Sequence, residues 1–210
     1  MDDGRTPTLA DEFGQIDIYL FDQLLKGRIV PGMTVFDAGC GGGRNLVYLL
    51  RAGYDVYGVD TSPAAVATVR RLAATLAPQL PAEHFRVEAV EHLSFPEAFA
   101  DVVLSSAVLH FAENDDHFTA MVQGTWRVLK PGGLFFCRLA SISGIANDVH
   151  ALDRGRFLLP DGSERYLVDE TRLLDLTNRL RGTLLDPLKT TIVHGQRAMT
   201  TWVIQKASDR

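Results

Sequence analysis

One short run near the beginning of the chain constrains its fold more than any other feature: Val35-Phe36-Asp37-Ala38-Gly39-Cys40-Gly41-Gly42-Gly43-Arg44-Asn45. Residues 34–36 predict the end of a buried strand, and residues 46–51 predict a helix. The glycines let the backbone turn sharply and approach a ligand more closely than a Cβ atom would allow. A strand, a glycine turn and a helix N-terminus also bring free N–H groups and a positive dipole end together. The run therefore predicts a site for a nucleotide-like ligand.

The spacing of the glycines separates two classes of nucleotide ligand. A dinucleotide fingerprint, G-x-G-x-x-G, needs a third glycine where this chain has Arg44. The chain instead has Asp37, Gly39, Gly41 and Gly43 at alternate positions, with the carboxylate two residues before the first glycine. A carboxylate there repels a pyrophosphate but can pair with an ammonium group. This pattern resembles the first motif of class I S-adenosylmethionine-dependent methyltransferases, whose cofactor has an amino-acid end and no phosphate.

Later segments resemble the same family in the expected order. Residues 54–60 predict a second strand that ends at Asp60, the position at which such folds hold ribose hydroxyls. Residues 101–110 resemble the family's fourth strand with the turn after it, and residues 128–134 resemble the turn into strand five. The resemblance covers about residues 30–140, and motifs in register are more specific than a lone glycine loop.

The resemblance implies S-adenosyl-L-methionine as the cofactor and S-adenosyl-L-homocysteine as the product. Many members carry an acid directly after strand three, but that position here is Ala89, so Val90 and Glu91 are the expected partners of the adenine. The residues expected to contact the cofactor are Tyr19, Asp37, Gly39, Cys40, Gly41, Arg44, Asn45, Asp60, Thr61, Val90, Glu91, Ser105 and Ser106.

His110 is the candidate catalytic residue. Imidazole can take up a proton near neutral pH, and His110 falls near the expected position of the transferred methyl group. The alternative, which we favour, is a packed histidine in the turn after strand four. The family's chemistry needs no fixed catalytic triad, because a sulfonium methyl group is already activated and the protein has mainly to align the nucleophile and exclude water.

Helices and strands alternate along the chain, which predicts an α/β fold with a parallel sheet covered on both faces. The expected architecture is a Rossmann-like three-layer sandwich with a mixed seven-stranded sheet, whose last two strands form an antiparallel hairpin. The hairpin is predicted from residues 188–193 and 199–205. Beyond the segments already described, helices are predicted over residues 11–25, 64–76, 115–129 and 169–180, and strands over residues 85–88 and 134–139.

The length predicts one domain over residues 1–210, with a helical cap over residues 1–30. Residues of about 140–168 predict a long irregular insertion, and long loops inside a compact domain are usually functional. Ligands of open α/β sheets bind beyond the carboxyl ends of the strands, so the insertion is expected to line a substrate pocket. Arginines there can face an acidic or oxyanionic substrate, although a solvated surface loop is the alternative. The candidate pocket residues are Arg138, Arg154, Arg156, Arg165 and Tyr166.

Composition narrows the possible partners. A net charge of −5 argues against a general nucleic-acid binder, which needs a basic face. Residues 105–108, Ser-Ser-Ala-Val, also lack the Asn/Asp-Pro-Pro-aromatic signature of methyltransferases that act on base amino groups. The apolar stretches are strand-sized, and the acidic N-terminus has no signal-peptide core, so no membrane span and a cytoplasmic location are expected. Cys40 and Cys137 lack metal-ligand spacing and predict free thiols, with no metal site.

The expected substrate is a small-molecule nucleophile. Residues 40–49 and 53–56 are similar to small bacterial tellurite-resistance-like methyltransferases and to their thiopurine-methyltransferase relatives, which act on soft or small nucleophiles. Two alternatives stay open: a non-catalytic S-adenosylmethionine-binding or regulatory protein, and a nicotinamide-dependent oxidoreductase, against which Arg44 speaks. The sequence does not predict the methyl acceptor or the oligomeric state.

Overall fold

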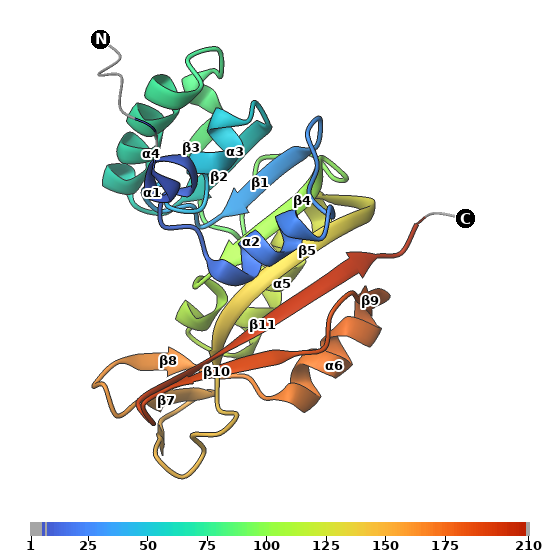
Figure 1. The fold of residues 1–210 in the computed structure, drawn as a ribbon. Coiled ribbons are helices and arrows are strands. Elements are labelled where there is room, and N and C mark those ends of the chain that lie inside the picture. The colour runs from blue at the N-terminus through green and yellow to red at the C-terminus, as the bar shows by residue number, and fades with distance from the viewer. Residues whose placement is uncertain (1–5, 7, 209–210) are drawn as a thin grey trace.

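The computed structural model describes residue 6 and residues 8–208, and its centre is a twisted sheet with helices on both faces (Figure 1). The strands of this sheet are β1 (Thr34–Ala38), β2 (Asp55–Asp60), β3 (Phe85–Val87), β4 (Ala100–Ser106), β5 (Leu129–Ser141), β9 (Gly182–Leu184), β10 (Lys189–Val193) and β11 (Arg197–Lys206). Their order is β10-β11-β5-β4-β1-β2-β3, and β9 pairs with β11. Strands β1 to β5 pair in parallel, whereas β11 runs antiparallel to its neighbours.

Helices cover both faces of the sheet. They are α1 (Leu9–Phe13), α2 (Ile18–Leu25), α3 (Val47–Arg51), α4 (Pro63–Leu76), α5 (Asp115–Val128) and α6 (Glu170–Arg179), with 3₁₀ turns η1 (Ala82–His84) and η2 (Leu109–Phe111). Consecutive strand residues point to opposite faces. Accordingly, Phe135 belongs to the core that α5 and α6 cover, and Phe136 to the core that α2, α3 and α4 cover. Helix α4 starts as predicted, with the Ser62 hydroxyl accepting from the Ala65 N–H at 3.3 Å.

The predicted fold class is confirmed, and the terminal hairpin is present. Strand β11 pairs with β5 from Ala198 opposite Ser141 to Gln205 opposite Leu134, and β10 continues the sheet on its other side. The sheet has one strand more than predicted, because β9 pairs with the end of β11. Three residues with no apolar alternation give little sequence signal, so β9 is defined by its tertiary partner.

The predicted helix over residues 11–25 is wrong in one respect, because the structure divides it into α1 and α2. Gly14 ends α1 with a φ of +62°. A new helix then begins at Asp17, whose side chain caps α2 by accepting from the Tyr19 N–H at 3.0 Å. The apolar periodicity that suggested one helix continues across a break made by glycine and a helix cap.

The insertion is more regular than predicted. Its residues form a small antiparallel sheet of β6 (His150–Ala151), β7 (Arg156–Leu158) and β8 (Glu164–Tyr166). This sheet lies beside the end of β10 and the start of β11 in Figure 1. Its apolar residues, among them Leu159 and Leu167, pack with Ala140 in a small core of their own. Within the part of the chain that the structure describes, none of the helices has the length and apolar character that a bilayer crossing requires.

Candidate functional site

A cavity of about 810 Å³ lies at the carboxyl ends of β1, β2 and β4. This is the edge at which open α/β sheets bind ligands. The expected cofactor residues that line it are Gly39, Cys40, Gly41, Arg44, Asn45, Asp60, Thr61, Val90, Glu91 and Ser106. These residues come from four separate stretches of the chain, so the fold brings together what the sequence motifs predicted separately.

The glycine loop between β1 and α3 forms one wall of the cavity. Gly39, Gly41 and Gly43 all have positive φ values, of +88°, +53° and +85°. A Cβ atom on Gly39 would lie 2.3 Å from the side chain of Val108, which also lines the cavity. A Cβ atom on Gly41 would meet no atom within 4 Å. Gly39 therefore allows close packing inside the protein, whereas Gly41 leaves its side of the loop open.

Asp60, the last residue of β2, fixes the glycine loop from the opposite side. Its carboxylate accepts from the Gly41 N–H at 2.9 Å and from the Ser62 N–H at 2.9 Å. A carboxylate has about four lone-pair sites, so these bonds leave acceptor capacity for hydroxyl groups in the cavity. Asp60 thus connects the loop, the start of α4 and the cavity.

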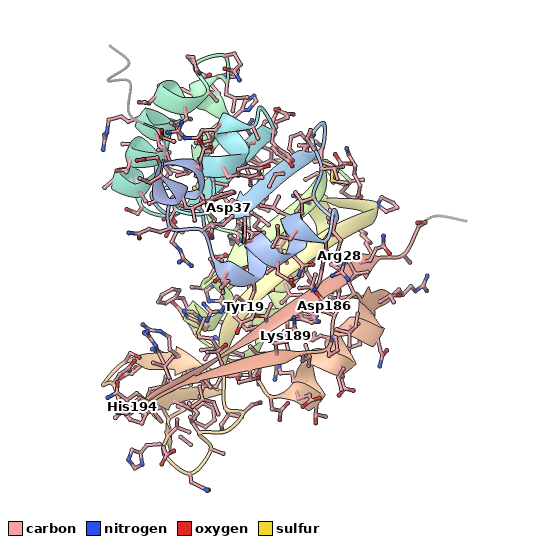
Figure 2. All side chains as sticks on the ribbon, viewed as in Figure 1. Tyr19, Arg28, Asp37, Asp186, Lys189 and His194 are labelled. Atoms are coloured by element: carbon pink, nitrogen blue, oxygen red, sulfur yellow. The ribbon has the colours of Figure 1, made fainter. Side chains whose placement is uncertain are left out.

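Asp37 lies at the carboxyl end of β1, directly before the glycine loop (Figure 2). Its side chain is buried and does not line the cavity. Burial raises the pKa of Asp37 to about 7, while the positive charge of Arg44 opposes that rise and Asp60 adds to it. A buried carboxylate poised near neutral pH has a strong electrostatic preference for a cation placed beside it.

Arg44 lies at the junction between the cavity and the N-terminal helices. Its guanidinium donates to the Ser106 hydroxyl at 3.2 Å and lies 3.8 Å from the Asp17 carboxylate. Asn45 accepts from the Asp17 N–H at 2.9 Å, and Arg138 donates to the same Asp17 carboxylate at 3.0 Å. Asp17, which sequence reasoning missed, is therefore the residue that joins α2 to the loop.

A carboxylate and an imidazole face each other at the other end of the cavity. His117 Nε2 lies 3.3 Å from the Glu91 carboxylate, and its Nδ1 accepts from the Glu113 N–H at 3.2 Å. Nδ1 is therefore the acceptor nitrogen, and Nε2 is the protonated nitrogen, on the side of the ring that faces Glu91. Sequence reasoning missed His117. Its position in the first turn of α5, three residues after the capping Asn114, carries no motif.

His110 does not line the cavity. It is buried in η2, where its Nδ1 accepts from the Ala140 N–H at 3.1 Å. Burial, together with the positive charge of Arg165, lowers the pKa of His110 to about 4. The side chain therefore connects the turn after β4 to β5 as a neutral imidazole.

Two other expected cofactor residues also lie outside the cavity lining. Tyr19 points from α2 toward the terminal hairpin (Figure 2), where its hydroxyl lies 2.6 Å from the hydroxyl of Thr191. Ser105 is fully buried within β4, on the face opposite its neighbour Ser106. Ala107, which follows β4 and lines the cavity, has a φ of +65°, which is uncommon for an L-residue other than Asn or Asp.

The candidate substrate residues do not converge. Arg154 and Arg156 pair with acids of the insertion itself, Asp153 at 3.3 Å and Glu164 at 2.9 Å. Tyr166 is buried, donates its hydroxyl to Asp115 and stacks on Phe118. The other two arginines, Arg138 and Arg165, lie nearer the cavity. Arg138 donates to the Asp17 carboxylate, and the guanidinium of Arg165 lies over the ring of Phe111.

The two cysteines are free and buried. Cys40 lines the cavity, and burial raises the pKa of both thiols above the ordinary value, so neither is an activated nucleophile. Among the residues that the structure describes, no group of His, Cys, Asp and Glu is arranged to hold a metal ion.

Comparisons with known proteins agree with this geometry. The family model described as a methyltransferase domain matches residues 36–137. An uncharacterized methyltransferase of Synechocystis sp. is 31% identical over 165 residues, which are 79% of this chain and 70% of that protein. The chain belongs to the S-adenosylmethionine-dependent methyltransferases.

Other methyltransferases share parts of the chain or its fold. A ubiquinone biosynthesis O-methyltransferase of Maricaulis maris is 31% identical over 130 residues, but these are 62% of this chain and less than half, 46%, of that protein. The solved structure of a SAM-dependent methyltransferase from Methanosarcina mazei has a TM-score of 0.69 at 22% identity, covering 89% of this chain and 98% of that one. Burkholderia thailandensis 1,6-didemethyltoxoflavin-N1-methyltransferase, solved with S-adenosylhomocysteine, has a TM-score of 0.69 at 20% identity, covering 94% and 80%.

Proposed function

We propose that this methyltransferase acts on a small-molecule nucleophile and that the cofactor and the acceptor share the cavity beside the glycine loop. The observation that carries the proposal is the cavity itself, whose volume of about 810 Å³ is lined by the glycine loop, Asp60 and Glu91. Volumes of roughly 300–1,000 Å³ are typical of small-ligand sites. This volume is room for a nucleoside cofactor and a small acceptor.

The residues of this chain fit S-adenosylmethionine along the length of the cavity. The open side of Gly41 accepts close contact with the cofactor, and Asp60 retains lone pairs for the ribose hydroxyls. The buried Asp37 carboxylate lies behind the cavity lining, so it suits the ammonium group through its charge and not through direct contact, and Arg44, which lines the cavity, suits the carboxylate of the same amino-acid end. Glu91, oriented by His117, then faces the adenine amino group in place of the acid that is absent at Ala89.

When bound, S-adenosylmethionine supplies a methyl group already activated by its sulfonium, so the chain has to align the acceptor and exclude water. We assign no general base to His110, because its Nδ1 already accepts from Ala140 and its Nε2 lies outside the cavity. The residues that border the acceptor end are Ser106, Ala107, Val108 and Phe111. Because these residues include no general base, we expect an acceptor that is already ionised or easily ionised.

A methyl-transfer screen tests this function. The purified chain is incubated with S-adenosylmethionine that carries a labelled methyl group and with thiols, phenols, amines and oxyanions. We expect transfer to members of one class and formation of S-adenosylhomocysteine in equal amount. Binding of S-adenosylmethionine without transfer to any class would favour the alternative of a non-catalytic binding protein.

A titration with NAD tests the second alternative, an oxidoreductase. We expect no binding, because Arg44 occupies the position where a dinucleotide loop needs its third glycine. The acidic net charge of −5 supports a small molecule over nucleic acid as the partner. The cytoplasmic location stays a prediction from the sequence.

A further inference from the structure

The charges that line the cavity are divided between its two ends. Of its carboxylates, Asp60 ends β2, and Glu88 and Glu91 follow β3. The lining residues that follow β4, from Ser106 to Phe111, carry no carboxylate. In the proposed function the carboxylate end faces the ribose and adenine, so the end after β4 is left for the acceptor.

A cation on the insertion side, Arg165, lies over the ring of Phe111, one of the lining residues after β4. Phe111 lines the cavity with 59% of its surface exposed, and the guanidinium centre of Arg165 lies 4.9 Å from the centroid of its ring. Arg165 belongs to β8, so the small sheet of the insertion places this charge next to Phe111, which lines the cavity. A guanidinium stacked on an aromatic ring is held in orientation while its edge N–H groups remain free to donate.

Arg165 differs from the other arginines near the site in having no carboxylate within ion-pair distance among the described residues. Arg154, Arg156 and Arg138 each pair with an acid within 3.3 Å. Within the described part of the chain, Arg165 makes no ion pair, and its hydrogen bond is a donation to the carbonyl of Glu164 at 2.7 Å. The Asp161 carboxylate accepts hydrogen bonds from the backbone and hydroxyl of Ser163, and these bonds, more than the positive charges of Arg197 and Arg165, lower its pKa.

We propose that Phe111 and Arg165 form the acceptor-recognition wall and that the acceptor is a flat, anionic small molecule, such as an aromatic carboxylate. The aromatic ring of the acceptor packs against Phe111, and its anionic group meets the guanidinium of Arg165 in a charge-assisted, bidentate contact. The positive charge of Arg165 attracts an anion, and the lining residues after β4 carry no carboxylate that would repel it. The inference rests on the proposed function, since the cofactor must occupy the other end.

Calorimetry with two ring compounds of equal shape tests the wall. The protein is first saturated with S-adenosylhomocysteine and then titrated with benzoate or with its neutral isostere, benzamide. We expect benzoate to bind about tenfold more tightly than benzamide, since only the carboxylate can form a charge-assisted, bidentate contact with the guanidinium. Arg165→Gln removes that preference, and Arg165→Lys keeps part of it, because the charge remains and the planar fork is lost.

Arg154→Gln is the matched control, because Arg154 lies in the same insertion with its side chain 70% exposed. We expect this variant to bind benzoate as the wild type does. Equal affinity for the two compounds, absence of benzoate binding, or an unchanged preference in Arg165→Gln would each overturn the inference and leave the proposed function intact. Failure of S-adenosylhomocysteine to bind in the first titration would instead overturn the proposed function, and the inference with it.

Discussion

The glycine loop and the insertion differ in how their residues come together. At the glycine loop, contacts are made by the backbone or by residues at strand ends, such as Gly41 and Asp60. In the insertion, the polar side chains largely pair with one another, as Arg156 does with Glu164. The difference suggests that cofactor binding is encoded in short local motifs, whereas acceptor recognition depends on a few side chains placed by tertiary packing.

The largest effect should come from the glycine loop. Gly41→Val places a side chain in the open space beside the loop, and we expect binding of S-adenosylhomocysteine to fall below detection in calorimetry. Gly53→Val is the matched control. Gly53 also has a positive φ, of +77°, and a Cβ atom there would meet nothing within 4 Å, but this residue does not line the cavity. Equal affinities in the two variants would show that the loop does not contact the cofactor.

Asp60→Ala should have the next largest effect. The substitution leaves ribose hydroxyls without an acceptor and releases the Gly41 N–H, so binding of S-adenosylmethionine should weaken by ~1–3 kcal/mol. Circular dichroism should show a preserved fold. Unchanged affinity with a normal spectrum would remove Asp60 from the site.

The buried Asp37 predicts a pH dependence at this end of the cavity. Its pKa of about 7 in the free protein must fall when a cation binds beside it, so affinity for S-adenosylhomocysteine should rise as pH increases. The expected rise is about tenfold between pH 6 and pH 8. In Asp37→Asn the affinity should be lower and the rise should be lost. A rise that persists in Asp37→Asn would assign the titration to another group.

The same carboxylate has an opposite effect on stability. Because its pKa is raised in the folded state, Asp37 binds more protons when folded than when unfolded between about pH 4 and pH 7. Its contribution to the free energy of unfolding is therefore lost as pH rises through this window. Asp37→Asn should unfold at a higher temperature than the wild type at pH 8, while binding the cofactor more weakly. A lower unfolding temperature would show that the carboxylate is stabilised by contacts beyond those described.

The smallest effect should come from His110, on the insertion side. Glutamine can replace the Nδ1 acceptor for the Ala140 N–H, so His110→Gln should retain kcat within about threefold, whereas loss of a general base lowers rates by roughly 10²–10⁴. The lowered pKa, of about 4, means that the unfolded chain takes up a proton here at higher pH than the folded protein does. Stability from His110 is thus present above about pH 6.5 and is lost toward pH 4. A hundredfold fall in kcat would restore His110 as a base.

Sequence reasoning reached further at the glycine loop than in the insertion for a physical reason. Strand ends, glycine turns and helix caps are local, so the expected residues Gly39, Asp60 and Thr61 could be placed beside a cavity from their motifs alone. Tyr19 could not, since the break at Gly14 turns α2 toward the terminal hairpin. His117 was missed because its meeting with Glu91 joins two elements that share no motif.

The insertion shows the same limit. Its polar and glycine-rich composition predicted an irregular loop, whereas its short strands pair with each other and pack apolar residues such as Leu159 inward. No feature of the sequence distinguished the five candidate substrate residues from one another. Their different environments, from the buried Tyr166 to the exposed Arg154, come from this packing.

Hydrogen exchange with and without S-adenosylhomocysteine tests the division of the cavity most directly. We expect slower exchange of backbone amides in residues 39–45, 60–62 and 88–91 when S-adenosylhomocysteine is bound, with the insertion strands over residues 150–166 unchanged. Protection confined to the insertion or to the terminal hairpin, with none in the glycine loop, would contradict this division.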